Sequence, residues 1–112
     1  MENRIQNDYS AYLLGRIKKA ILNVEPSAEV YLFGSRARDD FKEDSDWDLL
    51  ILLSAVINMD IKKRIVHNLL EIEISENQTF NRIYYNYDEW HSSKLIQATP
   101  FYQSVSKDAI KL

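Results

Sequence analysis

Two acidic residues, Asp46 and Asp48, are separated by one residue at the start of an apolar run, residues 49–53. Alternate residues of a β-strand point to the same face, so both carboxylates would project together, with Cα atoms roughly 6.5–7 Å apart. Carboxylates at this spacing suit a hard divalent cation such as Mg²⁺ or Mn²⁺. Placing charge at the head of a buried strand also costs energy unless a partner or cation offsets it. We therefore predict that Asp46 and Asp48 bind a metal ion and act in catalysis.

A Gly-Ser pair, Gly34 and Ser35, follows a second apolar run, residues 30–33, and is separated from Asp46 by residues 36–45. Gly34 has no Cβ and lets the backbone approach a phosphate closely. Ser35 offers a hydroxyl, and the amides that open the next turn can bind an anion. Arg36 and Arg38 add positive charge nearby. These two arginines either neutralise the acidic residues that follow or clamp a triphosphate, and the sequence leaves both interpretations open.

The acidic segment has two other interpretations. A calcium loop that begins at Asp44 would need Gly at its sixth position and Glu at its twelfth, but these positions hold Leu49 and Ala55. The EF-hand interpretation therefore fails. Alternatively, the aspartates only cap turns and stay solvated. The spacing to the Gly-Ser pair favours the functional interpretation.

Helices are predicted on both sides of these motifs. Apolar residues between Ile5 and Val24, including Tyr9 and Tyr12, recur at steps of three and four and indicate an amphipathic helix. Asp60 is expected to cap a second one, whose core face would use Ile61, Ile65, Leu69 and Ile72. Further helices are expected to start near residue 88 and to cover about 100–107.

Strands are predicted over residues 29–33, 46–53 and 79–86. The second is apolar on both faces after its acidic start and should therefore be central. The order of elements predicts an α+β fold, a small mixed β-sheet packed by helices. At 112 residues, we expect a single domain that spans residues 1–112.

Composition narrows the class of protein. The chain carries a net charge of −3 and no cysteine, which argues against general nucleic-acid binding and is compatible with a reducing cytoplasm. No apolar run approaches the roughly 20 residues that a membrane span requires. We therefore expect a cytoplasmic protein with neither a membrane nor a nucleic acid as its partner.

The segment from Gly34-Ser35 to Asp46-Trp47-Asp48 resembles the motif of the DNA polymerase beta-like nucleotidyltransferase superfamily. The likeness is greatest to its small bacterial members, the minimal nucleotidyltransferases. It implies that Gly34 and Ser35 bind the phosphates of ATP or another NTP, and that Asp46 and Asp48 bind Mg²⁺. The implied activity is transfer of an NMP, AMP from ATP being the first choice, to a hydroxyl of a protein or small molecule. Some such proteins are antitoxins that modify a helical HEPN-domain toxin.

One departure from this family concerns the third carboxylate. Active members usually carry it on a later strand, where it helps to bind metal and to activate the attacking hydroxyl. The strand predicted here over 79–86 contains no Asp or Glu, and Asn81 or Arg82 stands near the expected place. The alternative is therefore a catalytically weak or inactive module of the same fold that binds nucleotide or a partner.

A partner is expected because the length leaves no separate domain for an acceptor. It would be a HEPN-like toxin or a second copy of the chain in a homo-oligomer. Trp90, Phe101 and Tyr102 are candidates for an apolar contact surface.

Overall fold

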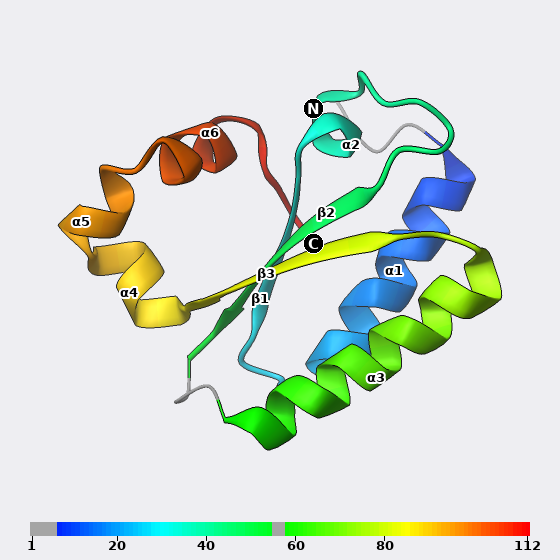
Figure 1. The fold of residues 1–112 in the computed structure, drawn as a ribbon, viewed down its shortest axis with the longest axis horizontal. Coiled ribbons are helices and arrows are strands. Elements are labelled where there is room, and N and C mark those ends of the chain that lie inside the picture. The colour runs from blue at the N-terminus through cyan, green and yellow to red at the C-terminus, as the bar shows by residue number, and fades with distance from the viewer. Residues whose placement is uncertain (1–6, 55–57) are drawn as a thin grey trace.

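The computed structural model describes residues 7–54 and 58–112 and has an α+β fold (Figure 1). Its first half contains α1 (Asp8–Leu22), β1 (Glu29–Phe33), α2 (Ser35–Arg38), β2 (Trp47–Leu53) and α3 (Met59–Glu76). Its second half contains β3 (Phe80–Asn86), α4 (Tyr87–Ser92), α5 (Lys94–Gln97), α6 (Pro100–Asp108) and β4 (Ile110–Lys111). The predicted fold class is therefore confirmed.

The described strands form one sheet in the order β3-β2-β1-β4. β1 pairs antiparallel with β2 and with β4, whereas β2 and β3 are parallel. The parallel pair needs a crossover, and α3 provides it. β2 is central and buried over residues 49–53, as its apolar sequence predicted.

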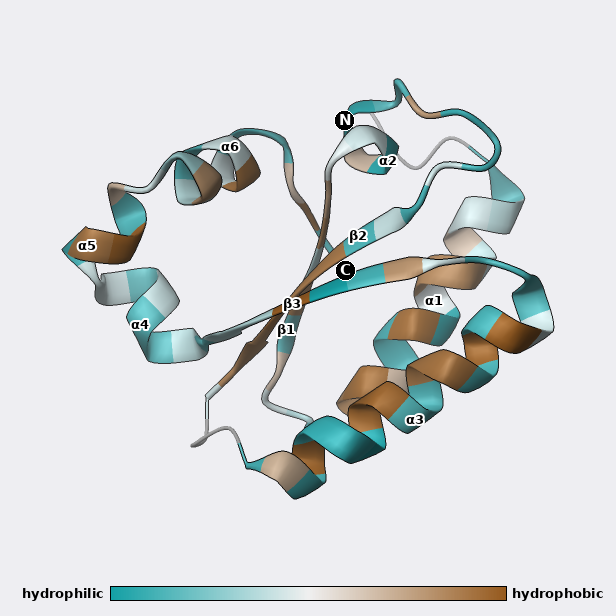
Figure 2. Ribbon diagram, in the orientation of Figure 1, coloured by the Kyte–Doolittle hydropathy of each residue, from teal (hydrophilic) through white to brown (hydrophobic). Residues whose placement is uncertain are grey.

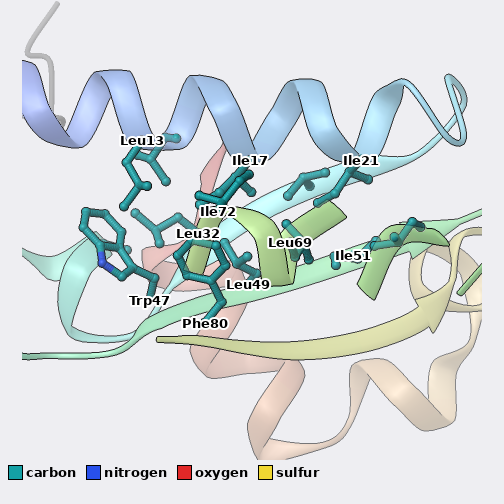
Figure 3. Close-up of a cluster of buried hydrophobic side chains, with 14 of the residues drawn as sticks. Leu13, Ile17, Ile21, Leu32, Trp47, Leu49, Ile51, Leu69, Ile72 and Phe80 are labelled. Atoms are coloured by element: carbon teal, nitrogen blue, oxygen red, sulfur yellow. The ribbon is translucent and has the colours of Figure 1, made fainter. Parts of the chain in front are cut away.

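The first face of the sheet packs against α1 and α3 (Figures 1 and 3). Leu13, Ile17 and Ile21 face the sheet from α1, and Ile65, Leu69 and Ile72 face it from α3. These spacings of three and four residues place the apolar side chains of each helix on one side. Figure 2 shows the same pattern as brown bands on the two helices and on β2. Ile61, also expected in this core, is only half-buried at its margin.

The second face of the sheet carries α4, α5 and α6, which gather on one side of it in Figure 1. Leu50 and Leu52 pack there with Trp90 and Val105. The ring centroid of Trp90 lies 6.0 Å from that of Phe101 and 4.7 Å from that of Tyr102, and Trp90 is only 5% exposed. Trp90 therefore belongs to the core, and its assignment to a partner surface was wrong, whereas Phe101 and Tyr102 are half-buried against this core and their part in such a surface stays a prediction.

Two details of the predicted helices also need correction. The cap of α3 is Asn58, whose Oδ1 accepts a hydrogen bond from Ile61 N at 2.8 Å, while Asp60 lies in the first turn. Tyr9 and Tyr12 are 42% and 52% exposed; instead of entering the core, their hydroxyls donate to Glu76. Ile5 lies outside the described residues.

In the described part of the chain, the helices are too short or too polar to cross a membrane.

Candidate functional site

Asp48 lies at the point where three strands of the sheet can contribute to one site. In the register of the sheet it pairs with Phe33, the last residue of β1, and with Asn81, near the start of β3. Paired residues of neighbouring strands point to the same face. Asp48, Asn81 and the turn that follows Phe33 are therefore neighbours at one end of the second face, where α2 begins (Figure 1).

The carboxylates of Asp46 and Asp48 converge on a single side-chain amide. Asn81 Nδ2 donates to Asp48 Oδ1 at 2.8 Å and approaches Asp46 Oδ2 at 3.4 Å. Asp46 and Asn81 are exposed and Asp48 is half-buried. The two acids therefore form an open cluster that a ligand can reach from solvent.

The Gly-Ser turn touches this cluster directly. Gly34 has φ 75° and ψ −156°, a conformation that L residues with a side chain rarely adopt. A Cβ built on Gly34 would stand 2.1 Å from Asp48 Oδ2. Glycine is therefore required here both by the backbone and by the space that the Asp48 carboxylate occupies.

Arg36 has a different environment from the one expected of a phosphate ligand. Its Nη2 donates to the carbonyl oxygens of Glu43 and Ser45, at 3.0 and 2.9 Å. Its guanidinium carbon lies 4.3 Å from the ring centroid of Phe41 and 4.1 Å from that of Trp47. Burial lowers the pKa of Arg36, but its ordinary value is so high that the group stays charged. These contacts hold the acidic loop, residues 39–46 between α2 and β2, against α2. They favour a structural role for Arg36 over phosphate binding.

Arg38, unlike Arg36, lies near Gly34. It lines a cavity of about 190 Å³ together with Phe33, Gly34, Phe101 and residues of α6. Its side chain is 43% exposed and its Nε pairs with Asp40 Oδ2 at 3.3 Å. An exposed pair of this kind is weak, so a phosphate can compete for the guanidinium. Ser35, the first residue of α2, is half-buried beside Gly34.

The acidic residues near β3 do not add a third carboxylate to this cluster. Glu73 forms an ion pair with Arg82 and accepts a hydrogen bond from Phe80 N at 2.9 Å. Arg82 pairs with Leu49 in the register, on the face opposite to Asp48. Glu71 pairs with His67 on the surface of α3. Of the two candidates near the expected place, Asn81 is therefore the one beside Asp48.

A divalent cation would find two carboxylates here and, beside them, the side-chain amide of Asn81, which presents its NH₂ group to them and carries an oxygen on the same planar group. Hard cations accept both donor types, and Mg²⁺ usually takes one or two protein carboxylates with water and phosphate oxygens for the rest. The donor set of Asp46, Asp48 and Asn81 therefore fits Mg²⁺ or Mn²⁺. Over residues 7–54 and 58–112, no three His, Cys, Asp or Glu side chains gather closely enough to hold a metal ion.

The sequence left open whether Arg36 neutralises the acidic residues or binds phosphate, and its stacking between two aromatic rings was not predicted. Phe41 and Trp47 follow Arg36 at the two ends of the acidic loop, and arginine often stacks on the face of an aromatic ring. The contact of Asn81 with both acids was not visible either, because it depends on the parallel register of β2 and β3.

The fold resembles those of known proteins. Two of the solved structures similar to this chain show this similarity. One is a toxin–antitoxin with AMP-PNP, with a TM-score of 0.58 and 16% identity over 87% of this chain and 69% of that chain. The other is a mutant of the toxin–antitoxin MntA–HpeT, with a TM-score of 0.57 and 14% identity over the same shares. At these identities the likeness concerns the fold.

No curated protein sequence matches the chain significantly. A family model does: the one described as a nucleotidyltransferase domain matches residues 14–97. This range contains the Gly-Ser turn, both acids and Asn81. Because the match covers most of the chain, this protein belongs to the nucleotidyltransferase domain family of transferase enzymes.

Proposed function

We propose that this protein transfers an NMP, AMP from ATP being the first choice, to a hydroxyl group of a protein or small-molecule acceptor. The observation that carries the proposal is the convergence of Asp46 and Asp48 directly beside the Gly34 turn. Two acids alone would be a common surface feature. Here, however, Asp48 lies directly against Gly34, and Asp46 shares the amide of Asn81 with it, so the acids are part of one site with the Gly-Ser turn.

The reaction joins the acceptor oxygen to the α-phosphorus of ATP. The bond from that phosphorus to the oxygen that bridges to the β-phosphate breaks, pyrophosphate leaves with the electron pair, and the hydroxyl proton passes to water. Mg²⁺ or Mn²⁺, when bound, neutralises phosphate charge and orients the triphosphate. The protein contributes mainly by positioning the reactants and by stabilising developing charge.

Each residue of the site has a role in this proposal. Asp46 and Asp48 would hold the divalent ion through carboxylate oxygens. Gly34 and Ser35 would lie against the β- and γ-phosphates, since glycine permits close approach of the backbone. Arg38 would bind the triphosphate in place of its exposed partner Asp40. Arg36 would act indirectly, because its hydrogen bonds position the loop that carries Asp46.

A protein partner is the second part of the proposal. The two similar structures named above are described as toxin–antitoxin, and one of them as having AMP-PNP. We infer that this chain is the antitoxin of such a pair, that a HEPN-like helical toxin is its partner, and that the acceptor hydroxyl lies on that toxin. A homo-oligomer that modifies itself is the other arrangement to be tested.

A specific observation favours a second candidate function. The position beside Asp48 on β3 holds the amide of Asn81 instead of a carboxylate. An amide is neutral and cannot accept a proton from the attacking hydroxyl. The alternative is therefore a module of the same fold that binds nucleotide or partner with little turnover.

A label-transfer experiment distinguishes an active nucleotidyltransferase from a binding module. The chain, alone and with the protein products of neighbouring genes, is incubated with Mg²⁺ and ATP labelled at the α-phosphate. We expect covalent label on one of the proteins, loss of labelling with Asp46→Asn, and retention with Asp44→Asn, an exposed acid of the same loop. No labelling under any of these conditions, with nucleotide and partner still bound, would establish the binding module.

A further inference from the structure

The side-chain amide of Asn81 stands where a cation shared by two acids would be expected. Its Nδ2 is 2.8 Å from Asp48 Oδ1 and 3.4 Å from Asp46 Oδ2. Asp46 and Asn81 are both exposed, so burial does not force this contact. Because two carboxylates repel each other, a donor between them keeps them together.

The same amide can also present an oxygen. An Asn side chain has a donor NH₂ group and an acceptor oxygen on one planar group, and its last torsion is soft. A turn of about half a circle exchanges the two. The NH₂ group suits the carboxylates by themselves, whereas the oxygen suits a hard cation bound to them.

We propose that Asn81 is a neutral third ligand of the divalent-metal site, and that its NH₂ group holds Asp46 and Asp48 in place before the ion binds. This inference rests on the proposed function. With an ion bound, the amide turns and its Oδ1 joins the two carboxylates. The protein ligands then carry two negative charges, one fewer than three carboxylates would carry.

The charge of the ligand set determines what the site can do. Fewer carboxylates give weaker binding of a hard cation, so the site would fill mainly when the triphosphate brings oxygens of its own. Metal and nucleotide would then bind together. The neutral amide also leaves the proton of the acceptor hydroxyl to water, which makes the transfer slow.

The neighbouring residues make a substitution at position 81 interpretable. Phe80 N is held by Glu73, and β3 pairs with β2 over residues 80–86, so the strand does not depend on the Asn81 side chain. Asn86, at the other end of β3, caps α4 by accepting from Glu89 N at 3.0 Å. Asp is an equally good cap. Asn86→Asp therefore adds the same charge to the same strand without disturbing the fold.

Mn²⁺ binding, measured by the loss of its free EPR signal without nucleotide, tests the inference. We expect Asn81→Asp to bind Mn²⁺ at least about tenfold more tightly than wild type, and Asn86→Asp to bind it as wild type does. We expect Asn81→Ala to bind it more weakly, because a ligand is lost. Thermal unfolding in EDTA should show that Asn81→Asp is less stable than wild type, with Mn²⁺ reversing the difference.

The outcomes separate this inference from the proposed function. If Asp46→Asn abolishes Mn²⁺ binding while Asn81→Asp and Asn81→Ala leave it unchanged, the role of Asn81 is overturned and the function stands. Tighter binding by Asn81→Ala would also overturn it, since the amide would then only compete with the ion. If wild type and Asn81→Asp both fail to bind Mn²⁺, with or without ATP, both proposals fall.

Discussion

The backbone of Gly34 lies directly against the carboxylate of Asp48. The Cβ of any other residue at position 34 would stand 2.1 Å from Asp48 Oδ2, and φ at this position is 75°. The turn at the end of β1 and the acid on β2 are thus one structural unit. The contact explains why glycine precedes serine in this motif on grounds of space as well as backbone conformation.

Gly34→Ala is expected to disrupt this unit. It should lower the free energy of unfolding by about 1–3 kcal/mol through backbone strain, and should weaken ATP binding because Asp48 must move. Gly15→Ala is the matched control: an added Cβ has nothing within 4 Å of it, and Ala should stabilise α1 by roughly 0.5–1 kcal/mol. Denaturant unfolding of both variants measures the change in stability, and ATP titration measures the change in affinity. Wild-type ATP affinity in folded Gly34→Ala would contradict it.

The two arginines of α2 are expected to show opposite effects. Arg36→Met loses two hydrogen-bonded carbonyls and two ring contacts, and should lower the free energy of unfolding by about 2–4 kcal/mol. Arg38→Met should change it by no more than about 0.5 kcal/mol, but should weaken ATP binding by roughly tenfold. Unfolding and ATP titrations on the same two proteins provide the comparison. A stable Arg36→Met with weak ATP binding would place Arg36 among the phosphate ligands after all.

Glu73 is expected to support β3 and to have no part in metal binding. It pairs with Arg82, and the two side chains are only 14% and 19% exposed. Glu73→Gln should lower the free energy of unfolding by about 1–3 kcal/mol, because the half-buried guanidinium of Arg82 loses its charged partner. Mn²⁺ affinity should not change. Weaker Mn²⁺ binding by this variant would make Glu73 the third carboxylate that we do not find beside Asp48.

Glu29 should make stability depend on acid pH. Burial by itself raises its pKa, but hydrogen bonds from His91, Lys111 and Tyr31 outweigh this and lower the pKa below 4.5. A carboxyl with a lowered folded-state pKa stabilises the fold above its unfolded pKa, and this contribution is lost as pH falls through the folded value. Glu29→Gln should therefore flatten the fall in stability below about pH 4.5. Urea midpoints across this range, with exposed Glu43→Gln as control, measure the effect; equal slopes for both variants would refute it.

The sequence predicted the parts of the fold that have a strong local signal. The strand over 29–33 matches β1 residue for residue, and β2 and β3 each begin one residue later than expected. It missed α5 and β4. α5 has four residues and shares Ser93 with the end of α4, so it shows no periodicity. β4 has two residues, which pair with Tyr31 and Leu32, and such a contact exists only in the folded chain.

The sequence named candidate site residues whose roles stay a prediction, and it did not show the way in which they meet. Motif spacing identified Gly34, Ser35, Asp46 and Asp48, whereas the contact of Asn81 with both acids requires the β2–β3 register. Arg36 and Arg38 look equivalent in the sequence. They differ only because α2 turns one toward the acidic loop and the other toward the cavity beside Gly34.

Isothermal titration calorimetry of ATP binding to wild type, Asp48→Asn and Asp44→Asn, with and without Mg²⁺, tests most directly whether Asp48 holds a metal ion that binds the triphosphate. We expect Mg²⁺ to strengthen ATP binding to wild type and to Asp44→Asn by on the order of tenfold or more, and we expect Asp48→Asn to lose this gain. The same Mg²⁺-dependent affinity in all three proteins would contradict it.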